Sequence, residues 1–152
     1  MEKTTAYVMC GIPGAGKSTY ANKLAETEDA MIISGDQIKN ELYGSPDVAG
    51  DWDTIWSRID QYISDYAPRT VILDGTHHRS DYRAEALMLL RSYGYENIEL
   101  VVMDVSLATA LARNFQRPYS VPDYVVKQMH EELQRSLKTV MSEEFDKFHF
   151  VY

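Results

Sequence analysis

Apolar residues along the chain concentrate in five short runs, at residues 6–10, 30–34, 70–74, 98–104 and 148–151. Within each run the apolar character is nearly continuous and does not alternate with polar positions. Continuous runs of this length are typical of strands that are covered on both faces, as in a parallel sheet. We therefore predict five β-strands with both faces buried.

The longest helical pattern lies between the second and third of these runs. Apolar residues recur there at three- and four-residue steps over residues 52–66, which predicts a helix with one apolar face. Trp52 and Trp56 belong to this stripe, and we interpret them as core residues rather than as a stacking surface for a cofactor. The preceding residues 43–51 are rich in glycine, proline and aspartate, which predicts an exposed, irregular loop.

Three further helices are expected, over residues 80–93, 106–111 and 122–140. Ser80 and Ser106 are N-cap candidates for the first two of these. Strands and helices alternate along the whole chain, and this order is typical of an α/β domain with a mostly parallel sheet of four to five strands, flanked by helices.

Length and composition fit one soluble domain over residues 1–152. The chain has 45% hydrophobic and 25% charged residues, the balance of an ordinary globular protein. No apolar stretch reaches the roughly 18 residues that a membrane span needs, and no secretory signal precedes the first strand. The single cysteine, Cys10, has no partner for an internal disulfide and is interpreted as a small buried residue. These features predict a cytoplasmic protein without a membrane partner.

The charge of the chain is acidic but uneven. The net charge of −8 argues against attraction of the whole protein to nucleic acid or to an anionic membrane. Residues 47–66 carry five aspartates and one arginine, a net of −4, whereas residues 113–138 carry a net of +2. A local basic pocket can therefore still bind an anion.

A phosphate-binding loop follows the first predicted strand directly. Residues 11–18 read Gly-Ile-Pro-Gly-Ala-Gly-Lys-Ser and fit G-x-x-x-x-G-K-[ST] at every fixed position. Such a loop turns its N–H groups toward phosphate oxygens at the start of a helix. Lys17 is expected to contact the β- and γ-phosphates, and the Ser18 hydroxyl to bind Mg²⁺. We therefore predict that ATP is bound by Gly11, Ile12, Pro13, Gly14, Ala15, Gly16, Lys17, Ser18 and Thr19.

Two carboxylates follow predicted strands, and parallel strands end at one edge of a sheet. Asp36 comes after the second strand and is a candidate general base that accepts a hydroxyl proton, with helix capping as the alternative. Lys39, three residues later, could hold an anionic acceptor, with a solvated surface lysine as the alternative. Asp74 ends the third strand, where a carboxylate beside a phosphate-binding loop commonly serves Mg²⁺.

Histidines and arginines provide the remaining candidate contacts. His77 is predicted to face the substrate and His78 to be exposed, because adjacent histidines point in different directions. Arg113 and Arg117 are four residues apart and precede a proline-containing break. From there they could fold over the nucleotide and stabilise charge on the transferred phosphoryl group.

The reaction class follows from what surrounds the loop. The domain is small for a motor ATPase, and it lacks the Asn-Lys-x-Asp motif that reads guanine. Acidic and basic residues at the strand ends, where α/β sheets bind ligands, favour a kinase. A nucleotide-dependent switch without a phosphate acceptor is a third class, which predicts hydrolysis without a phosphorylated product.

These residues together resemble the polynucleotide 5′-hydroxyl kinase family of P-loop phosphotransferases. The resemblance rests on residues 11–18, on Asp36 with Lys39, on residues 74–77, and on Arg113-x-x-x-Arg117. It implies a three-layer P-loop kinase fold with a helical lid, and ATP- and Mg²⁺-dependent phosphorylation of the 5′-OH end of RNA or DNA. Members are often fused to a phosphatase or ligase, which implies that such an activity could come here from a separate partner.

The resemblance also implies a role for each matching residue. Lys17 and Ser18 would bind triphosphate and Mg²⁺, Asp36 would be the base, and Arg117 would contact the β- and γ-phosphates. Lys39 stands where the family usually has arginine, beside the phosphate next to the acceptor hydroxyl. The family's Asp-x-Thr-Asn segment corresponds to Asp74-Gly75-Thr76-His77, so Thr76 and His77 would lie at the substrate. The alternative is a P-loop kinase of a metabolite, nucleoside or sugar with the same catalytic parts.

Overall fold

Five strands form one sheet in the order β2-β3-β1-β4-β5, and every neighbouring pair is parallel. The computed structural model describes residues 3–46 and 48–152. The strands are β1 (Thr5–Cys10), β2 (Met31–Ser34), β3 (Val71–Asp74), β4 (Asn97–Met103) and β5 (Lys147–Val151). Their bounds agree with the predicted runs to within one residue, and the α/β prediction is confirmed.

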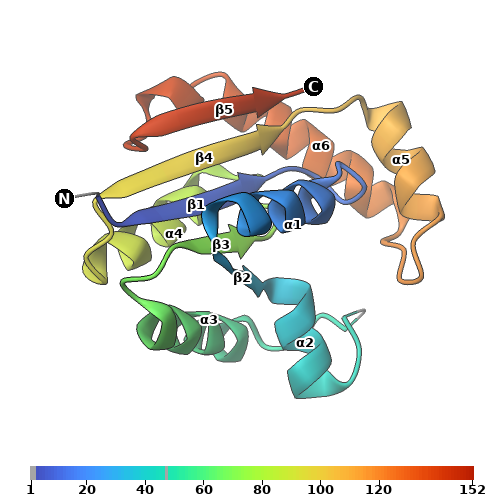
Figure 1. The fold of residues 1–152 in the computed structure, drawn as a ribbon. Coiled ribbons are helices and arrows are strands. Elements are labelled where there is room, and N and C mark those ends of the chain that lie inside the picture. Colours follow the sequence, from blue (N-terminus) through green and yellow to red (C-terminus); the bar gives the residue numbers. More distant parts are fainter. Residues whose placement is uncertain (1–2, 47) are drawn as a thin grey trace.

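The described residues form six α-helices, with α1 on one face of the sheet and α4 and α6 on the other (Figure 1). Beyond the β2 edge lie α2 and α3, and α5 lies past the C-terminal ends of the strands (Figure 1). The helices are α1 (Lys17–Glu28), α2 (Gly35–Tyr43), α3 (Trp52–Tyr66), α4 (Ser80–Ser92), α5 (Leu107–Phe115) and α6 (Asp123–Leu137), followed by a 3-10 turn, η1 (Val140–Ser142).

Burial follows the position of each strand in the sheet. In β1 and β4 every residue after the first is buried, as predicted for strands covered on both faces. The same prediction is wrong for β5, where Lys147 and Phe150 are exposed. Within residues 3–46 and 48–152, this strand pairs with β4 alone and forms an edge of the sheet, so no further strand lies beside it.

The predicted helices form with shifts at their ends. Ser106 caps α5 by accepting a hydrogen bond from Thr109 N at 3.1 Å, but the helix runs on to Phe115. Ser80, the expected cap of α4, is instead the first helical residue, after Arg79 at the N-cap. The late helix ends at Leu137, short of the predicted residue 140.

The apolar face of α3 is narrower than its sequence pattern indicated. Ile55, Ile59 and Ile63 are buried against the core. The prediction that Trp52 is a core residue is wrong, because 52% of the residue is exposed. It lies in the first turn of α3, where its ring stacks on Trp56 with 5.7 Å between the ring centroids. The expected loop over residues 43–51 separates α2 from α3, and residue 47 lies outside the described residues.

None of the helices within the described residues is long and apolar enough to cross a bilayer.

Candidate active site

The phosphate-binding loop connects β1 to α1 at the C-terminal edge of the sheet. Gly14 and Gly16 have φ angles of 85° and 93°, in the left-handed region that favours glycine. Gly16 is the N-cap of α1 and has no side chain, so no side-chain cap occupies the first N–H groups of the helix. An anion can therefore take these donors together with the positive end of the helix dipole.

Lys17 lies over this loop and donates a hydrogen bond from Nζ to the Ile12 carbonyl oxygen at 3.0 Å. Burial lowers the pKa of Lys17, while the nearby carboxylates of Asp74 and Asp36 raise it. The amine is thus held at the loop by a neutral carbonyl, a weaker partner than the charged oxygens of a phosphate.

Asp74 and Ser18 meet beside Lys17. The Ser18 hydroxyl donates to Asp74 Oδ2 at 3.1 Å, across the end of β3. Burial raises the pKa of Asp74, against the opposing effect of the Lys17 charge and the Ser18 hydrogen bond. A hydroxyl and a carboxylate are both oxygen ligands of the kind that Mg²⁺ prefers, so this pair fits the predicted metal site.

Asp36 occupies the first turn of α2, two residues past the end of β2. The N-cap of this helix is Ser34, whose hydroxyl accepts the Gln37 N–H at 3.3 Å, so Asp36 is not needed for capping. Its side chain is 61% exposed and forms an ion pair with Arg117, with Asp36 Oδ2 3.5 Å from Arg117 Nη2. The carboxylate is therefore open to an acceptor and is held by an arginine from the far side of the site.

Arg113 and Arg117 both belong to the end of α5 and the turn after it. The backbone of α5 lies directly against the phosphate-binding loop, because a Cβ on Gly14 would overlap the Ala110 carbonyl oxygen and lie 3.1 Å from Asn114 N. Arg113 donates to the Ala15 carbonyl oxygen at 3.4 Å. The lid arginines are thus brought to the loop by direct contact between backbones.

Asn114 supports the turn before Arg117, and the sequence reasoning did not identify it. It is buried, and its amide donates to Val121 O at 2.6 Å while its carbonyl oxygen accepts Val121 N–H at 3.1 Å. These two bonds close the turn that presents Arg117. The sequence signal was the position of Asn114 four residues after the apolar Ala110, on the same face of the helix. The sequence reasoning considered only the two arginines near it.

The loop after β3 places the two histidines differently from the prediction. His78 was expected to be exposed, and it is buried, with Nε2 3.1 Å from Glu132 Oε2 on α6 and Nδ1 2.9 Å from Thr76 Oγ1. His77 is partly buried, and its Nδ1 lies 2.7 Å from the Met9 carbonyl oxygen. Burial lowers the pKa of His77 to about 4, so the ring is neutral at pH 7.

The remaining predicted contacts lie around the same edge of the sheet. Lys39 is partly buried on α2 and forms no hydrogen bond or ion pair with any residue that the structure describes. Thr19 is exposed on the first turn of α1. The structure thus brings the loop, Asp36, Asp74 and the arginines to one edge, whereas the Thr76 hydroxyl is turned to His78.

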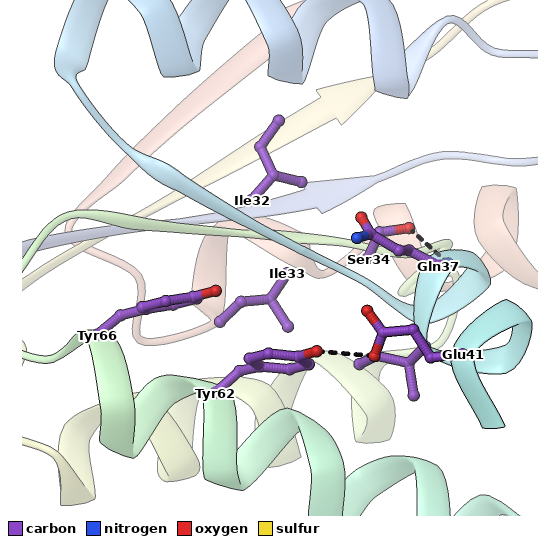
Figure 2. Close-up of a pocket in the computed structure, with 8 residues that line it drawn as sticks. Ile32, Ile33, Ser34, Gln37, Glu41, Tyr62 and Tyr66 are labelled. Carbon is purple, nitrogen blue, oxygen red and sulfur yellow. Dashed lines mark hydrogen bonds between the residues drawn. The ribbon is translucent and has the colours of Figure 1, made fainter.

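A small pocket of about 50 Å³ lies between β2, α2 and α3 (Figure 2). Figure 2 shows the Tyr62 hydroxyl bonded to Glu41, with a separation of 2.7 Å. The volume of the pocket is far below the roughly 300–1,000 Å³ that is typical of small-molecule sites. Glu41 is the acidic residue of its lining, and its Oε2 also lies 3.7 Å from Arg58 Nη1.

The fold and this edge define a P-loop nucleotide-binding domain, with a parallel sheet, a phosphate-binding loop and flanking helices. The chain belongs to the AAA domain family (AAA_33), which matches residues 7–137.

Known proteins that resemble the chain include a curated phosphodiesterase and two solved structures. The 2′,3′-cyclic-nucleotide 3′-phosphodiesterase of Mus musculus is 26% identical over 100 residues, which cover 62% of this chain and 23% of that protein. A chain of the Pnkp1/Rnl/Hen1 RNA repair complex matches 91% of this chain and 47% of its own length, with 18% identity and a TM-score of 0.80. A gluconokinase from Sinorhizobium meliloti 1021 matches 99% of this chain and 83% of its own, with 18% identity and a TM-score of 0.58. The chain therefore spans less than half the length of the first two of these proteins, and the structural matches establish the fold alone.

Proposed function

We propose that the protein is a kinase that transfers the γ-phosphoryl group of ATP to a hydroxyl group, with Asp36 as the general base. The observation that carries this proposal is the ion pair between Asp36 and Arg117 above the phosphate-binding loop. It joins an exposed carboxylate, which can accept a proton, to a lid arginine, which can stabilise phosphoryl charge. A switch that only hydrolyses nucleotide predicts inorganic phosphate as the product, whereas the proposed kinase predicts a phosphorylated hydroxyl compound.

Each group has one task in the proposed reaction. The N–H groups of residues 11–18 and the Lys17 ammonium bind the phosphates, since Lys17 can exchange the Ile12 carbonyl for a phosphate oxygen. Asp36 accepts the proton of the attacking hydroxyl as the oxygen bonds to the γ-phosphorus, and the bond from the γ-phosphorus to the bridging oxygen of the β-phosphate breaks to release ADP. Arg117 leaves Asp36 for the transferred phosphoryl group, and Arg113 supports the lid from Ala15.

Ser18 and Asp74 would hold Mg²⁺. When bound, the ion neutralises charge on the β- and γ-phosphate oxygens. The protein's own contribution is to keep a hydroxyl and a partly buried carboxylate together at the end of β3.

For the acceptor, we propose the 5′-OH end of RNA or DNA. Three observations support it. The motifs resemble those of polynucleotide kinases, and the fold matches a chain of an RNA repair complex. Lys39 lies on α2 one turn after Asp36 and has no partner among the described residues, so it is available to a phosphate next to the acceptor hydroxyl. A separate phosphatase or ligase would complete such a repair activity.

A second candidate acceptor is a small hydroxyl compound without a polyanionic backbone. The observation in its favour is the charge of the surface beyond Asp36, where Glu41, Asp51 and Asp53 accompany α2 and the start of α3. Such a surface repels a chain of phosphates. The fold match to a gluconokinase is consistent with this acceptor.

Label transfer from γ-labelled ATP distinguishes these acceptors. The protein is incubated with Mg²⁺ and either 5′-hydroxyl RNA, 5′-hydroxyl DNA or a panel of sugars, nucleosides and amino alcohols. Label on an oligonucleotide that falls about tenfold or more in Lys39→Ala supports the nucleic-acid acceptor. Transfer to an oligonucleotide that is unchanged in Lys39→Ala contradicts the proposed role of Lys39. If label appears only on a small compound, the nucleic-acid acceptor is contradicted and the second candidate acceptor is supported.

A further inference from the structure

The segment between β3 and α4 adopts an uncommon backbone conformation at His77. Its φ angle is 41°, in the left-handed region that non-glycine residues rarely occupy. Strain of this kind persists only where the surroundings hold it in place. The contacts around His77 show what holds it.

His77 is bonded to the end of β1 through its side chain. Nδ1 lies 2.7 Å from the Met9 carbonyl oxygen. A carbonyl oxygen can only accept, so Nδ1 carries the hydrogen and Nε2 is the unprotonated nitrogen. The Thr76 carbonyl oxygen next to it accepts the N–H of Gly11, the first residue of the phosphate-binding loop, at 2.8 Å. The strained segment is therefore attached to β1 just before and just after the strand ends.

Arg83 holds the other side of His77. Its side chain is fully buried, and Nη1 donates to the His77 carbonyl oxygen at 2.9 Å. The same guanidinium makes a two-point ion pair with Glu143, with Nε and Nη2 each 2.8 Å from a carboxylate oxygen. The Cys10 thiol is a second donor to the His77 carbonyl oxygen, at 3.2 Å.

These bonds form one connected path from a buried ion pair to the phosphate-binding loop. Glu143 fixes Arg83, Arg83 fixes the His77 backbone, and His77 and Thr76 fix Met9 and Gly11. Asp74, the proposed Mg²⁺ ligand, ends β3 at the base of the same segment. The path thus sets how the loop and Asp74 lie relative to each other.

We propose that Arg83 is a positioning residue. It holds the segment after β3 so that the phosphate-binding loop and Asp74 keep the relative position needed to bind Mg²⁺–ATP. This inference rests on the proposed function and extends it to a residue that touches no substrate. A buried ion pair is seldom more stable than well-packed apolar residues of the same size. The directional bonds of Arg83 therefore count for more in orientation than in stability.

The test separates orientation from stability with the double variant Arg83→Met/Glu143→Leu. This variant removes both charges and keeps most of the buried volume, so it leaves no unpaired ion. Arg79→Met is the matched control, because Arg79 makes a comparable two-point pair with Asp81 on the exposed start of α4. Melting temperature, Kd for Mg²⁺–ATP and kcat are measured for each protein.

Positioning predicts that the double variant melts near the wild type but binds Mg²⁺–ATP or turns over about tenfold or more worse. The control should match the wild type in all three measurements. A folded double variant with wild-type Kd and kcat overturns the proposal. Because Kd for Mg²⁺–ATP needs no acceptor, a protein that binds ATP but phosphorylates nothing would contradict the proposed function and leave this test intact.

His77 provides a second route if the double variant does not fold. Asparagine tolerates the left-handed conformation and its amide can donate to Met9 O, whereas alanine can do neither well. His77→Asn should keep the Kd for Mg²⁺–ATP within about threefold, and His77→Ala should weaken it about tenfold. Equal, wild-type affinity in both variants overturns the proposal.

Discussion

The contact between the phosphate-binding loop and α5 makes Gly14→Ala an informative substitution. The new Cβ would overlap the Ala110 carbonyl oxygen and lie 3.0 Å from the Ala110 carbonyl carbon. Gly14 also has a φ of 85°, which alanine adopts only with strain. We expect the variant to be less stable and to bind ATP more weakly, because either the loop or α5 must move.

The expected loss in the free energy of unfolding of Gly14→Ala has two parts. The left-handed conformation costs alanine roughly 1–2 kcal/mol, and forcing a methyl group into a packed contact costs a further ~1–3 kcal/mol. Gly94→Ala is the matched control, since Gly94 has a φ of 89° and a methyl group there would have no heavy atom within 4 Å. It should lose only the conformational part, so the difference between the variants isolates the contact with α5.

Urea unfolding and ATP titration measure both consequences. We expect Gly14→Ala to lose roughly 1–3 kcal/mol more of the free energy of unfolding than Gly94→Ala, together with most of its ATP affinity. Gly94→Ala should bind ATP like the wild type. Equal stability of the two variants, with normal ATP binding by Gly14→Ala, would refute the contact as described.

Three further predictions concern the pH dependence of stability, the Mg²⁺ requirement of turnover and the role of Arg117. Burial lowers the pKa of His77 from 6.5 to about 4, so the fold is favoured when His77 is neutral, and this stability is lost as the pH falls from 6.5 toward 4. Between pH 7 and pH 5 the free energy of unfolding should therefore drop by about 2 kcal/mol more in the wild type than in His77→Asn. Parallel pH profiles of the two proteins would contradict this. Asp74→Asn should raise the Mg²⁺ concentration for half-maximal turnover about tenfold or more and leave metal-free ATP binding little changed; an unaltered Mg²⁺ titration would remove Asp74 from the metal site. Arg117→Ala should lower kcat about 100-fold or more without a measurable change in melting temperature, because its pair with Asp36 is exposed to solvent; a wild-type kcat would exclude it from the transferred phosphoryl group.

Local patterns in the sequence predicted the framework of the site. The apolar runs located all five strands, and the spacing within residues 11–18 located the phosphate-binding loop. Parallel strands end together, so the sequence also indicated that Asp36 and Asp74 would share one edge. The structure has Ser34 opposite Asp74 in the register of β2 and β3, which brings the two strand ends side by side.

Contacts between distant elements could not be predicted in the same way. The pairing of Asp36 with Arg117 depends on how α5 packs against the loop, and the burial of His78 depends on Glu132 of α6. Arg83 did leave a signal, because it precedes the buried Ala86 and Leu90 by three and seven residues and so shares their face of α4. A charged residue within an apolar stripe indicates a buried ion pair, but its partner Glu143 lies 60 residues away.

Transfer from γ-labelled ATP by the wild type and by Asp36→Asn tests the central claim most directly. Both proteins should bind Mg²⁺–ATP alike, because in the proposed reaction Asp36 acts on the acceptor hydroxyl and not on the bound nucleotide. The account predicts label on a hydroxyl acceptor with the wild type and a loss of about 100-fold or more in Asp36→Asn. Release of label only as inorganic phosphate, or transfer by Asp36→Asn at the wild-type rate, would contradict it.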